Sequence, residues 1–279
     1  MLPRHGALKI ALLFFALRLA LSAPALGADS DQPFSLPVGS TNVSKITEQD
    51  FSRVPNEVAS LYRDEIVASG AALAMDLNWR NPYFGAGSSL QGEAFSIMIW
   101  GGLARIPEMT LDTLALITCH EIGHRIGGSP RQDAPLPEWS SSEGQADYFA
   151  ASQCLKKYFS GQDSAQAVSK MSVDPGVSTR CKSAHTDSQE AAVCVRIALS
   201  AKSFIQVTEA LTTEPHDVAF STPDMTTVQS TLKNTYPSPQ CRLDTFVAGA
   251  LSNRSEDARP ACWFKSQSPR ELQSGSLGS

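Results

Sequence analysis

The segment His120-Glu121-Ile122-Gly123-His124 constrains this chain more than any other part of its sequence. Residues four apart lie on one face of a helix, so the imidazoles of His120 and His124 can bind the same metal ion. Glu121 lies beside them, where its carboxylate can take a proton from a water that the metal activates. The five residues therefore predict a helix that carries part of a metal site. Because such a motif also arises by chance, the rest of the chain has to support it.

The N-terminus has the composition of a secretory signal peptide. A basic start at Arg4 and Lys9 is followed by an apolar run over residues 10–21 and then by small residues suited to cleavage. An uncleaved membrane anchor is the alternative, but the run is short for a spanning helix and Arg18 interrupts it. We therefore expect residues 1–28 to be removed and the protein to be exported, to a periplasm or into the medium.

The mature chain is acidic. The whole sequence holds 23 Lys and Arg against 28 Asp and Glu, and removal of the signal peptide takes away three basic residues and no acids, which leaves a charge of −8. An acidic protein without a basic stripe is poorly suited to nucleic acid or to an anionic membrane surface. No later segment is predicted to cross a bilayer. We therefore expect no nucleic-acid partner and no stable membrane insertion after signal cleavage.

All six cysteines lie after the signal peptide. An even number in an exported chain favours disulfides, although six cysteines can pair in many ways. Cys181 with Cys194, or Cys241 with Cys262, would close short loops, but the sequence does not decide the pairing. No C-x-x-C pair is present, which argues against a cysteine zinc site. Cys119 points about 100° away from the neighbouring histidine around the helix, so it suits packing better than metal binding.

The order of periodic segments predicts an α+β domain. Residues 29–45 are polar, contain Pro and Gly, and are predicted to be a linker. A helix is expected over 47–69, and alternating apolar and polar residues predict strands over 73–79 and 95–100. Between the strands, the Gly, Pro and Ser residues of 80–92 predict a connection. The pattern favours two or three antiparallel strands.

The metal motif falls at the end of a predicted helix that is anchored in a core. Thr110 is the expected N-cap of this helix, and Gly127-Gly128 with Pro130 should end it. After it the sequence predicts, in order, a Pro-rich loop over 129–142, a helix over 143–159, a loop to about residue 183, a helix over 188–211, a short helix over 239–251 and a disordered tail over 266–279.

The histidine pair needs a third ligand, since a catalytic zinc takes three protein ligands and one open position. One large class uses a third histidine in H-E-x-x-H-x-x-G-x-x-H, but here Pro130 stands at that position and has no ligating side chain. Glu143, at the start of the next helix, is the predicted ligand. Asp147 follows one turn later on the same face and is predicted to accept a hydrogen bond from a ligating imidazole. The reverse assignment stays open, because aspartate also binds zinc.

This set of groups suits the hydrolysis of an amide. Two neutral imidazoles and one carboxylate leave a bound zinc with net positive charge, which lowers the pKa of a bound water towards ~7. Glu121 is expected to remove that proton as the water attacks a carbonyl, and then to pass it to the leaving amine. We therefore expect one Zn²⁺ per chain and a zinc-dependent endopeptidase.

The residues around these motifs resemble a known family. Gly101-Gly102-Leu103 and a threonine-capped helix lead into the HEIGH motif, and Glu143 and Asp147 follow in EGQADYFA. This order is similar to that of the gluzincin metallopeptidases, and most similar to the CAAX prenyl endopeptidase family and its soluble bacterial periplasmic relatives. The resemblance covers roughly residues 70–250. It implies a mainly helical, zincin-type metallopeptidase domain, here 46–265, with a small antiparallel sheet beside the HExxH helix.

The resemblance also implies how substrate is bound and which further residues line the site. In the family the strand before the motif helix is an edge that can pair with the backbone of substrate, so residues 95–100 would bind a protein or peptide in extended form. Family members carry a Thr-His-Pro segment with an arginine a few residues on, and this chain has Thr235-Tyr236-Pro237 and Arg242. Tyr236 departs from the family's histidine: its hydroxyl can donate to an oxyanion, and pure packing is an equal alternative. Arg242 could orient Asp147, stabilise the transition state or form an ordinary salt bridge.

Two other interpretations stay open. A metallopeptidase fold can serve as a binding or assembly and quality-control factor of the cell envelope; Tyr236 and the loop over 129–142 favour this, whereas an intact Glu121 favours catalysis. The other is a structural domain with an accidental motif. Of the remaining histidines in the mature chain, His185 is expected at the surface, and His216 could approach the site.

Overall fold

The helix that carries the two histidines is the central element of the fold. In the computed structural model it is α4, Leu111–Ile126, and its residues 113–124 are all buried. Thr110 caps its start as predicted, since its side chain accepts a hydrogen bond from the backbone amide of Thr113. The helix ends at the predicted glycine pair, where Gly128 has a φ of 85°, a conformation that glycine adopts without strain.

Phe34–Ser279 forms one unit by its internal contacts, and all described helices and strands belong to it. The signal peptide predicted over residues 1–28 and nearly all of the tail predicted over 266–279 lie outside the described residues. The structure describes residues 34–212, 217–252 and 258–266.

The described elements confirm the α+β class. They are α1 (Glu48–Ser60), α2 (Arg63–Ala68), β1 (Ala72–Asn78), β2 (Ala86–Gln91), β3 (Ala94–Trp100), α3 (Gly101–Ala104), α4, α5 (Glu143–Phe149), a π-helical turn η1 (Ala150–Cys154), α6 (Leu155–Phe159), α7 (Ser164–Val168), α8 (Pro175–Ala184), α9 (Ser188–Glu209) and α10 (Pro239–Leu251).

The three strands form a mixed sheet, which corrects the predicted antiparallel one. Their order is β1-β3-β2. β2 and β3 pair antiparallel, whereas β1 pairs parallel with β3. β1 lies beside β3 rather than beside β2, its neighbour in sequence. Because the chain reverses direction twice between β1 and β3, the two strands run the same way.

β3 is the central strand, so the expectation that residues 95–100 form a sheet edge is wrong. The backbone of β3 is paired on both sides, and Phe95, Ile97 and Ile99 are fully buried. The edges of the described sheet are β1 and β2. Since α4 packs against β2 and β3, while β1 packs against α1 and α2, β2 is the edge beside the motif helix.

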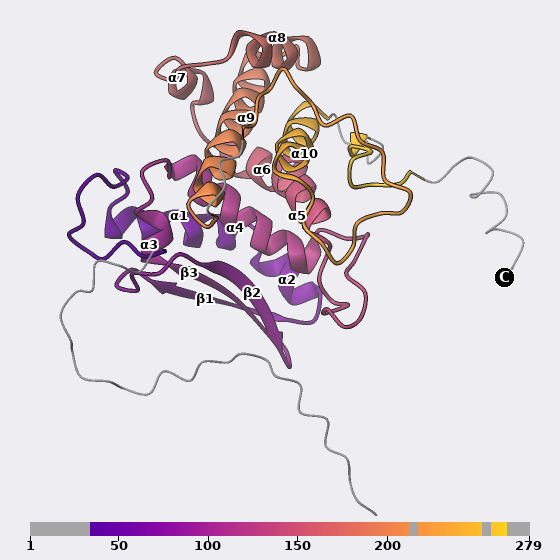
Figure 1. Ribbon diagram of the computed structural model, residues 1–279. Helices are drawn as coiled ribbons and strands as arrows, with labels where there is room; N and C mark the ends of the chain where they lie inside the picture. The colour runs from indigo at the N-terminus through magenta and orange to yellow at the C-terminus, as the bar shows by residue number, and fades with distance from the viewer. Residues whose placement is uncertain (1–33, 213–216, 253–257, 267–279) are drawn as a thin grey trace, which may run out of the picture. The chain divides into compact units, whose positions relative to one another are not determined.

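Helices cover one face of the sheet. Figure 1 shows α1, α2 and α4 on that face, with α9 and α10 beyond α4. The register places Leu73 opposite Phe95 and Met75 opposite Ile97, so the apolar side chains of neighbouring strands share the helix-facing side. Burial of this face against α4 fixes the sheet beside the metal motif.

A glycine pair allows β3 to turn directly into α3. A Cβ on Gly101 would lie 1.9 Å from the carbonyl oxygen of Trp79, and one on Gly102 would lie 1.9 Å from that of Pro82. No other residue fits so close to a backbone oxygen. Both glycines are therefore required by packing at this turn.

Several predicted segments differ from the structure in detail. The helix predicted over 47–69 is divided into α1 and α2, and the helix over 143–159 contains the turn η1. The loop predicted up to residue 183 is wrong, because it contains α7 and α8. Both have polar sequences without an apolar stripe, and each begins at an aspartate cap, Asp163 and Asp174. The helix predicted over 239–251 is confirmed as α10.

α9 is long and apolar enough to cross a membrane by length and composition, contrary to the expectation for the mature chain. About two-thirds of its most apolar window (67%) is buried inside the protein. It also carries the buried Arg196, whose guanidinium binds the carboxylate of Asp112 in α4 through contacts of 2.7 and 2.9 Å. In this structure α9 is a core helix, and its apolar character serves packing.

Three disulfides link the cysteines, and no cysteine is free. Cys181–Cys194 and Cys241–Cys262 are the two short-range pairs considered from the sequence. The third joins Cys119 in α4 to Cys154 at the end of η1, across 35 residues. Cys119 is therefore neither a metal ligand nor a free packing residue. Three disulfides indicate an oxidising, exported compartment.

The disulfide Cys119–Cys154 should contribute more to stability than the disulfide Cys181–Cys194. A disulfide removes conformational entropy from the unfolded chain. Over the 35-residue separation of Cys119–Cys154 this raises the free energy of the unfolded chain by about 4 kcal/mol, and over the 13-residue separation of Cys181–Cys194 by about 3 kcal/mol. Replacing both Cys119 and Cys154 with alanine should therefore lower the free energy of unfolding more than the matching change at Cys181 and Cys194. Urea unfolding followed by circular dichroism measures both. Equal stability of the first variant and wild type would contradict the assigned bond.

Candidate metal centre

α4 places three of the predicted site residues in one buried turn. His120, Glu121 and His124 are each 6–7% exposed. The two imidazole rings lie with centroids 4.7 Å apart, as their four-residue spacing on a helix requires. α4 is capped at its start and packed on several sides, so its last turns have little freedom to move these side chains.

The orientation of His124 is fixed by the end of the loop over 129–142. Its Nδ1 lies 2.9 Å from the carbonyl oxygen of Ser141 and 3.0 Å from Oγ of Ser140. A carbonyl only accepts, so the hydrogen bond to Ser141 requires the proton on Nδ1. The lone pair of His124 then lies on Nε2, which is 3.8 Å from a carboxylate oxygen of Glu143.

His120 is oriented in the same way by a carboxylate. Its Nδ1 lies 2.7 Å from Oδ1 of Asp147, a side chain with no exposed surface. The angle of this contact is not that of an aligned hydrogen bond. Because an ionised carboxylate has no proton to donate, its neighbour Nδ1 is the favoured place for the proton of the neutral imidazole, which leaves the lone pair of His120 on Nε2. That Nε2 is 3.3 Å from Oε2 of Glu143. Both histidines therefore turn an electron pair toward the same glutamate.

Glu143 completes a set of three ligands. It is the first residue of α5, and its carboxylate and the two imidazoles offer atoms that all lie within 4.8 Å of one another. Oε2 of Glu143 is buried and has no hydrogen-bond donor among the described residues. Two nitrogen lone pairs and an unsatisfied carboxylate oxygen facing one point repel each other unless a cation lies between them. These residues fit a metal ion.

The formal charges favour a divalent ion. Glu121, Glu143 and Asp147 are three acids in or beside the cluster, and Arg242 is one base, which leaves two negative charges in excess when the histidines are neutral. Imidazole nitrogen ligands favour zinc or a similar transition metal over Mg²⁺ or Ca²⁺, which prefer oxygen. A set of two imidazoles and one carboxylate with an open position is typical of catalytic zinc.

Asp147 is balanced from its other side by Arg242 in α10. The guanidinium donates to both carboxylate oxygens, with Nε–Oδ2 at 2.7 Å and Nη2–Oδ1 at 2.8 Å. It also lies over the ring of Phe204 at 4.7 Å. Of the three roles considered for Arg242, this contact fits two: it is a salt bridge, and it can orient Asp147. Asp147 in turn contacts His120, as the preferred assignment predicted.

The pKa shifts of the cluster all favour the charged form of the residue concerned. Burial disfavours the charged form of His120, but the carboxylates of Asp147 and Glu143 outweigh burial and raise the pKa of His120 to about 10. Burial also opposes ionisation of both acids, yet Arg242 and His120 hold the pKa of Asp147 below its ordinary value, and His120 and His124 do the same for Glu143. The carboxylates around the ring nitrogens therefore favour a positive charge there. Either a proton or a metal cation can provide it.

Tyr236 lies at the rim of this cluster. Its side chain is 67% exposed, and the guanidinium of Arg242 lies 5.4 Å from the centre of its ring. Partial burial of the hydroxyl and the negative charges of Glu143 and Glu121 raise the pKa of Tyr236 to about 12, with Arg242 acting in the opposite direction. Its high exposure speaks against the alternative that Tyr236 serves packing alone.

A glycine inside the motif allows α5 to approach α4. A Cβ on Gly123 would lie 3.0 Å from both Cα and the carbonyl oxygen of Ala146, and 3.1 Å from the ring of Phe149. Any larger residue would push α5 away and move Glu143 from the histidines. This role of Gly123 was not predicted from the sequence, although a glycine inside a helix is a signal of close packing.

Sequence reasoning missed several other contacts. Ser140 and Ser141 fix His124, and Phe204 lies against Arg242 with its ring centroid 6.5 Å from that of His120. None of these residues has a type or spacing that marks it. His185 was predicted at the surface but is buried, with Nε2 3.0 Å from the carbonyl oxygen of Ala250. His216 lies outside the described residues.

A second group, Asp224 with Cys241 and Cys262, also brings potential ligand atoms together. The two cysteines are joined in a disulfide, so neither can supply a thiolate. In the part of the chain that the structure describes, the histidine cluster is therefore the metal site to consider.

Comparisons with family models, with curated proteins and with solved structures found no match for this chain.

Replacing Asp147 with asparagine should weaken metal binding by roughly 10- to 100-fold, the usual effect of losing the carboxylate behind a ligating histidine. Competition with a chromophoric chelator measures this affinity. Asp112→Asn is the matched control, because it breaks another carboxylate–guanidinium pair, with Arg196, away from the metal cluster. Equal metal affinity of the two variants would show that Asp147 does not support the site.

Proposed function

We propose that this chain is an exported zinc metalloendopeptidase that hydrolyses peptide bonds in protein substrates. The observation that supports this most strongly is the convergence of His120 Nε2, His124 Nε2 and the Glu143 carboxylate, with Glu121 on the same helical turn. A binding protein needs the three ligands but has no need of a further buried acid, Glu121, beside them.

The residues of the site have two proposed roles: some are metal ligands, and others transfer or donate protons. His120, His124 and Glu143 would hold a zinc ion, which supplies Lewis-acid polarisation of a carbonyl and acidification of water when bound. The Glu121 carboxylate is the base that removes a proton from the attacking water and returns it to the leaving amine. Tyr236, at the rim, can donate its hydroxyl proton in a hydrogen bond to the developing oxyanion.

The support for these ligands matches their proposed role. A carboxylate behind a ligating histidine fixes its tautomer and raises its basicity, and Asp147 stands in this relation to His120. The carbonyl of Ser141 does the same for His124. Both ligands are therefore preorganised before any metal arrives, which lowers the reorganisation required for binding.

The sheet edge beside α4 suggests how substrate lies. β2 is an edge strand with small side chains, Ala86, Gly87, Ser88 and Ser89, along most of its length. An extended peptide could pair with this backbone, as a strand is added to a sheet. In this proposal β2 takes the role that the family resemblance suggested for residues 95–100. Small side chains on the edge imply recognition of backbone more than of particular side chains.

The resemblance to gluzincins, and to the soluble relatives of the CAAX prenyl endopeptidases, agrees with this set of roles. The order of His120, His124, Glu143 and Asp147 along the chain carries that resemblance, and Arg242 bound to Asp147 adds to it. The three disulfides support export, and periplasm or medium is the proposed location.

Glu121→Gln tests the proposal directly. The variant should bind zinc like wild type, about one ion per chain, because Glu121 is not a ligand. It should lose at least about 100-fold in hydrolysis of a denatured, fluorescently labelled protein, because the base is gone. Metal content is measured by plasma mass spectrometry. Glu138→Gln, in the exposed part of the loop over 129–142, is the matched control and should stay active.

Three results would contradict parts of this proposal. Full activity of Glu121→Gln would show that the base is wrongly assigned. A wild-type protein that holds zinc and binds envelope proteins, but cleaves no unfolded substrate, would favour the binding or quality-control role instead. Absence of zinc after metal-replete purification would leave only a structural domain.

Tyr236→Phe separates catalysis from binding at the rim. If the hydroxyl stabilises the oxyanion, kcat should fall by roughly 100-fold, while KM stays near the wild-type value. Steady-state kinetics on a quenched peptide measure both constants. A variant with wild-type kcat would show that Tyr236 takes no part in the chemistry.

A further inference from the structure

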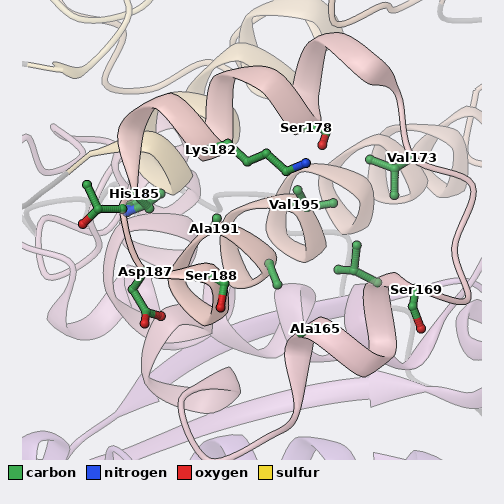
Figure 2. Close-up of a pocket in the computed structure, with 13 residues that line it drawn as sticks. Ala165, Ser169, Val173, Ser178, Lys182, His185, Asp187, Ser188, Ala191 and Val195 are labelled. Carbon is green, nitrogen blue, oxygen red and sulfur yellow. The ribbon is translucent and has the colours of Figure 1, made fainter.

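Away from the metal cluster, α7, α8 and α9 line a solvent-open cavity of about 480 Å³, shown in Figure 2. None of the metal-cluster residues lines it. Sites for small organic ligands are commonly of roughly 300–1,000 Å³. The cavity is therefore of a size that holds a ligand, and its lining indicates which class of ligand.

One wall of the cavity is apolar. α9 contributes Ala191, Ala192 and Val195, all of them buried, and Val168 and Val173 contribute from α7 and the segment after it. The two alanines leave space where larger residues would fill it. Such a surface gains free energy when an apolar chain displaces water from it.

The opposite side carries one uncommitted cation. Lys182 extends along α8 with its amine toward Ser178 in Figure 2. It makes no hydrogen bond or ion pair with any residue that the structure describes. Lys182 is exposed to solvent. Because its stem borders the apolar lining and no carboxylate among the described residues already pairs with its amine, it is placed to pair with an anion that enters.

The other charged or titratable groups of the lining are already engaged. Asp187 caps α9, because its Oδ1 accepts hydrogen bonds from the amides of Gln189 and Glu190. His185 uses Nε2 to bind the carbonyl oxygen of Ala250, 3.0 Å away. The remaining polar lining consists of hydroxyl groups, which can donate to an anion's oxygens: Ser169, Ser178, Thr186 and Ser188.

We propose that this cavity is a second binding site, independent of the metal cluster, for a small apolar carboxylate of the medium-chain alkyl class. The alkyl chain lies against Val168, Val173 and Val195, and the carboxylate pairs with Lys182. A cationic ligand would meet the lysine with the same sign of charge, and a neutral one would leave the lysine unused. The chemistry of the lining therefore selects an amphipathic anion.

Octanoate is a suitable probe, with octanamide as its neutral counterpart. Titration calorimetry on the wild-type mature chain should show saturable binding of octanoate, about tenfold tighter than binding of octanamide. Lys182→Met should remove this tenfold preference and leave octanamide affinity unchanged, while Lys182→Arg keeps it. Lys170→Met is the matched control, since Lys170 lies close in sequence to the lining residue Ser169 but outside the lining itself, and its loss should change nothing.

A second variant tests the place of the alkyl chain. Ala191→Leu fills part of the cavity and should abolish binding of both ligands, and nuclear Overhauser contacts between octanoate and valine methyls should disappear with it. No saturable binding up to about 1 mM would overturn the proposal. Binding that Ala191→Leu abolishes but Lys182→Met leaves unchanged would overturn the anionic class. Neither result depends on whether the chain hydrolyses peptides.

Discussion

A carboxylate with no exposed surface, that of Asp147, is the constraint on which the candidate site depends. An ionised acid in such a place is very costly unless charged partners surround it. Arg242 binds both of its oxygens, and Nδ1 of His120 contacts Oδ1. The same contact places the proton of His120 on Nδ1 and leaves Nε2 free. The contacts that stabilise the buried charge of Asp147 therefore also orient His120 for metal binding. Stability and metal binding depend on the same contacts.

The candidate site also requires that three helices distant in sequence come close together. α4 supplies the histidines, α5 supplies Glu143 and Asp147, and α10 supplies Arg242. Gly123 lets α5 approach α4, and the disulfide of Cys119 fixes α4 to η1, which directly follows α5. The ligand atoms repel each other when no ion is bound. These packing contacts and the disulfide hold the atoms in place against that repulsion.

Much of this arrangement could be predicted from local sequence, and the rest depends on contacts that no local pattern records. Helix spacing placed His120 with His124 and Glu143 with Asp147, and the cap at Thr110 and the pair Gly127-Gly128 set the limits of α4. The strand order failed because alternation identifies a strand but not its partner. α7 and α8 were missed because they have polar sequences, and the burial of His185 was missed because its partner lies 65 residues away.

The most direct measurement of the central claim is X-ray absorption at the zinc edge of the metal-replete protein. We predict a zinc bound by two imidazole nitrogens at about 2.0–2.1 Å and by oxygen atoms at about 2.0–2.2 Å, with no sulfur among its ligands. A shell with sulfur at about 2.3 Å, or one without imidazole, would place the metal elsewhere and contradict the assignment of His120, His124 and Glu143.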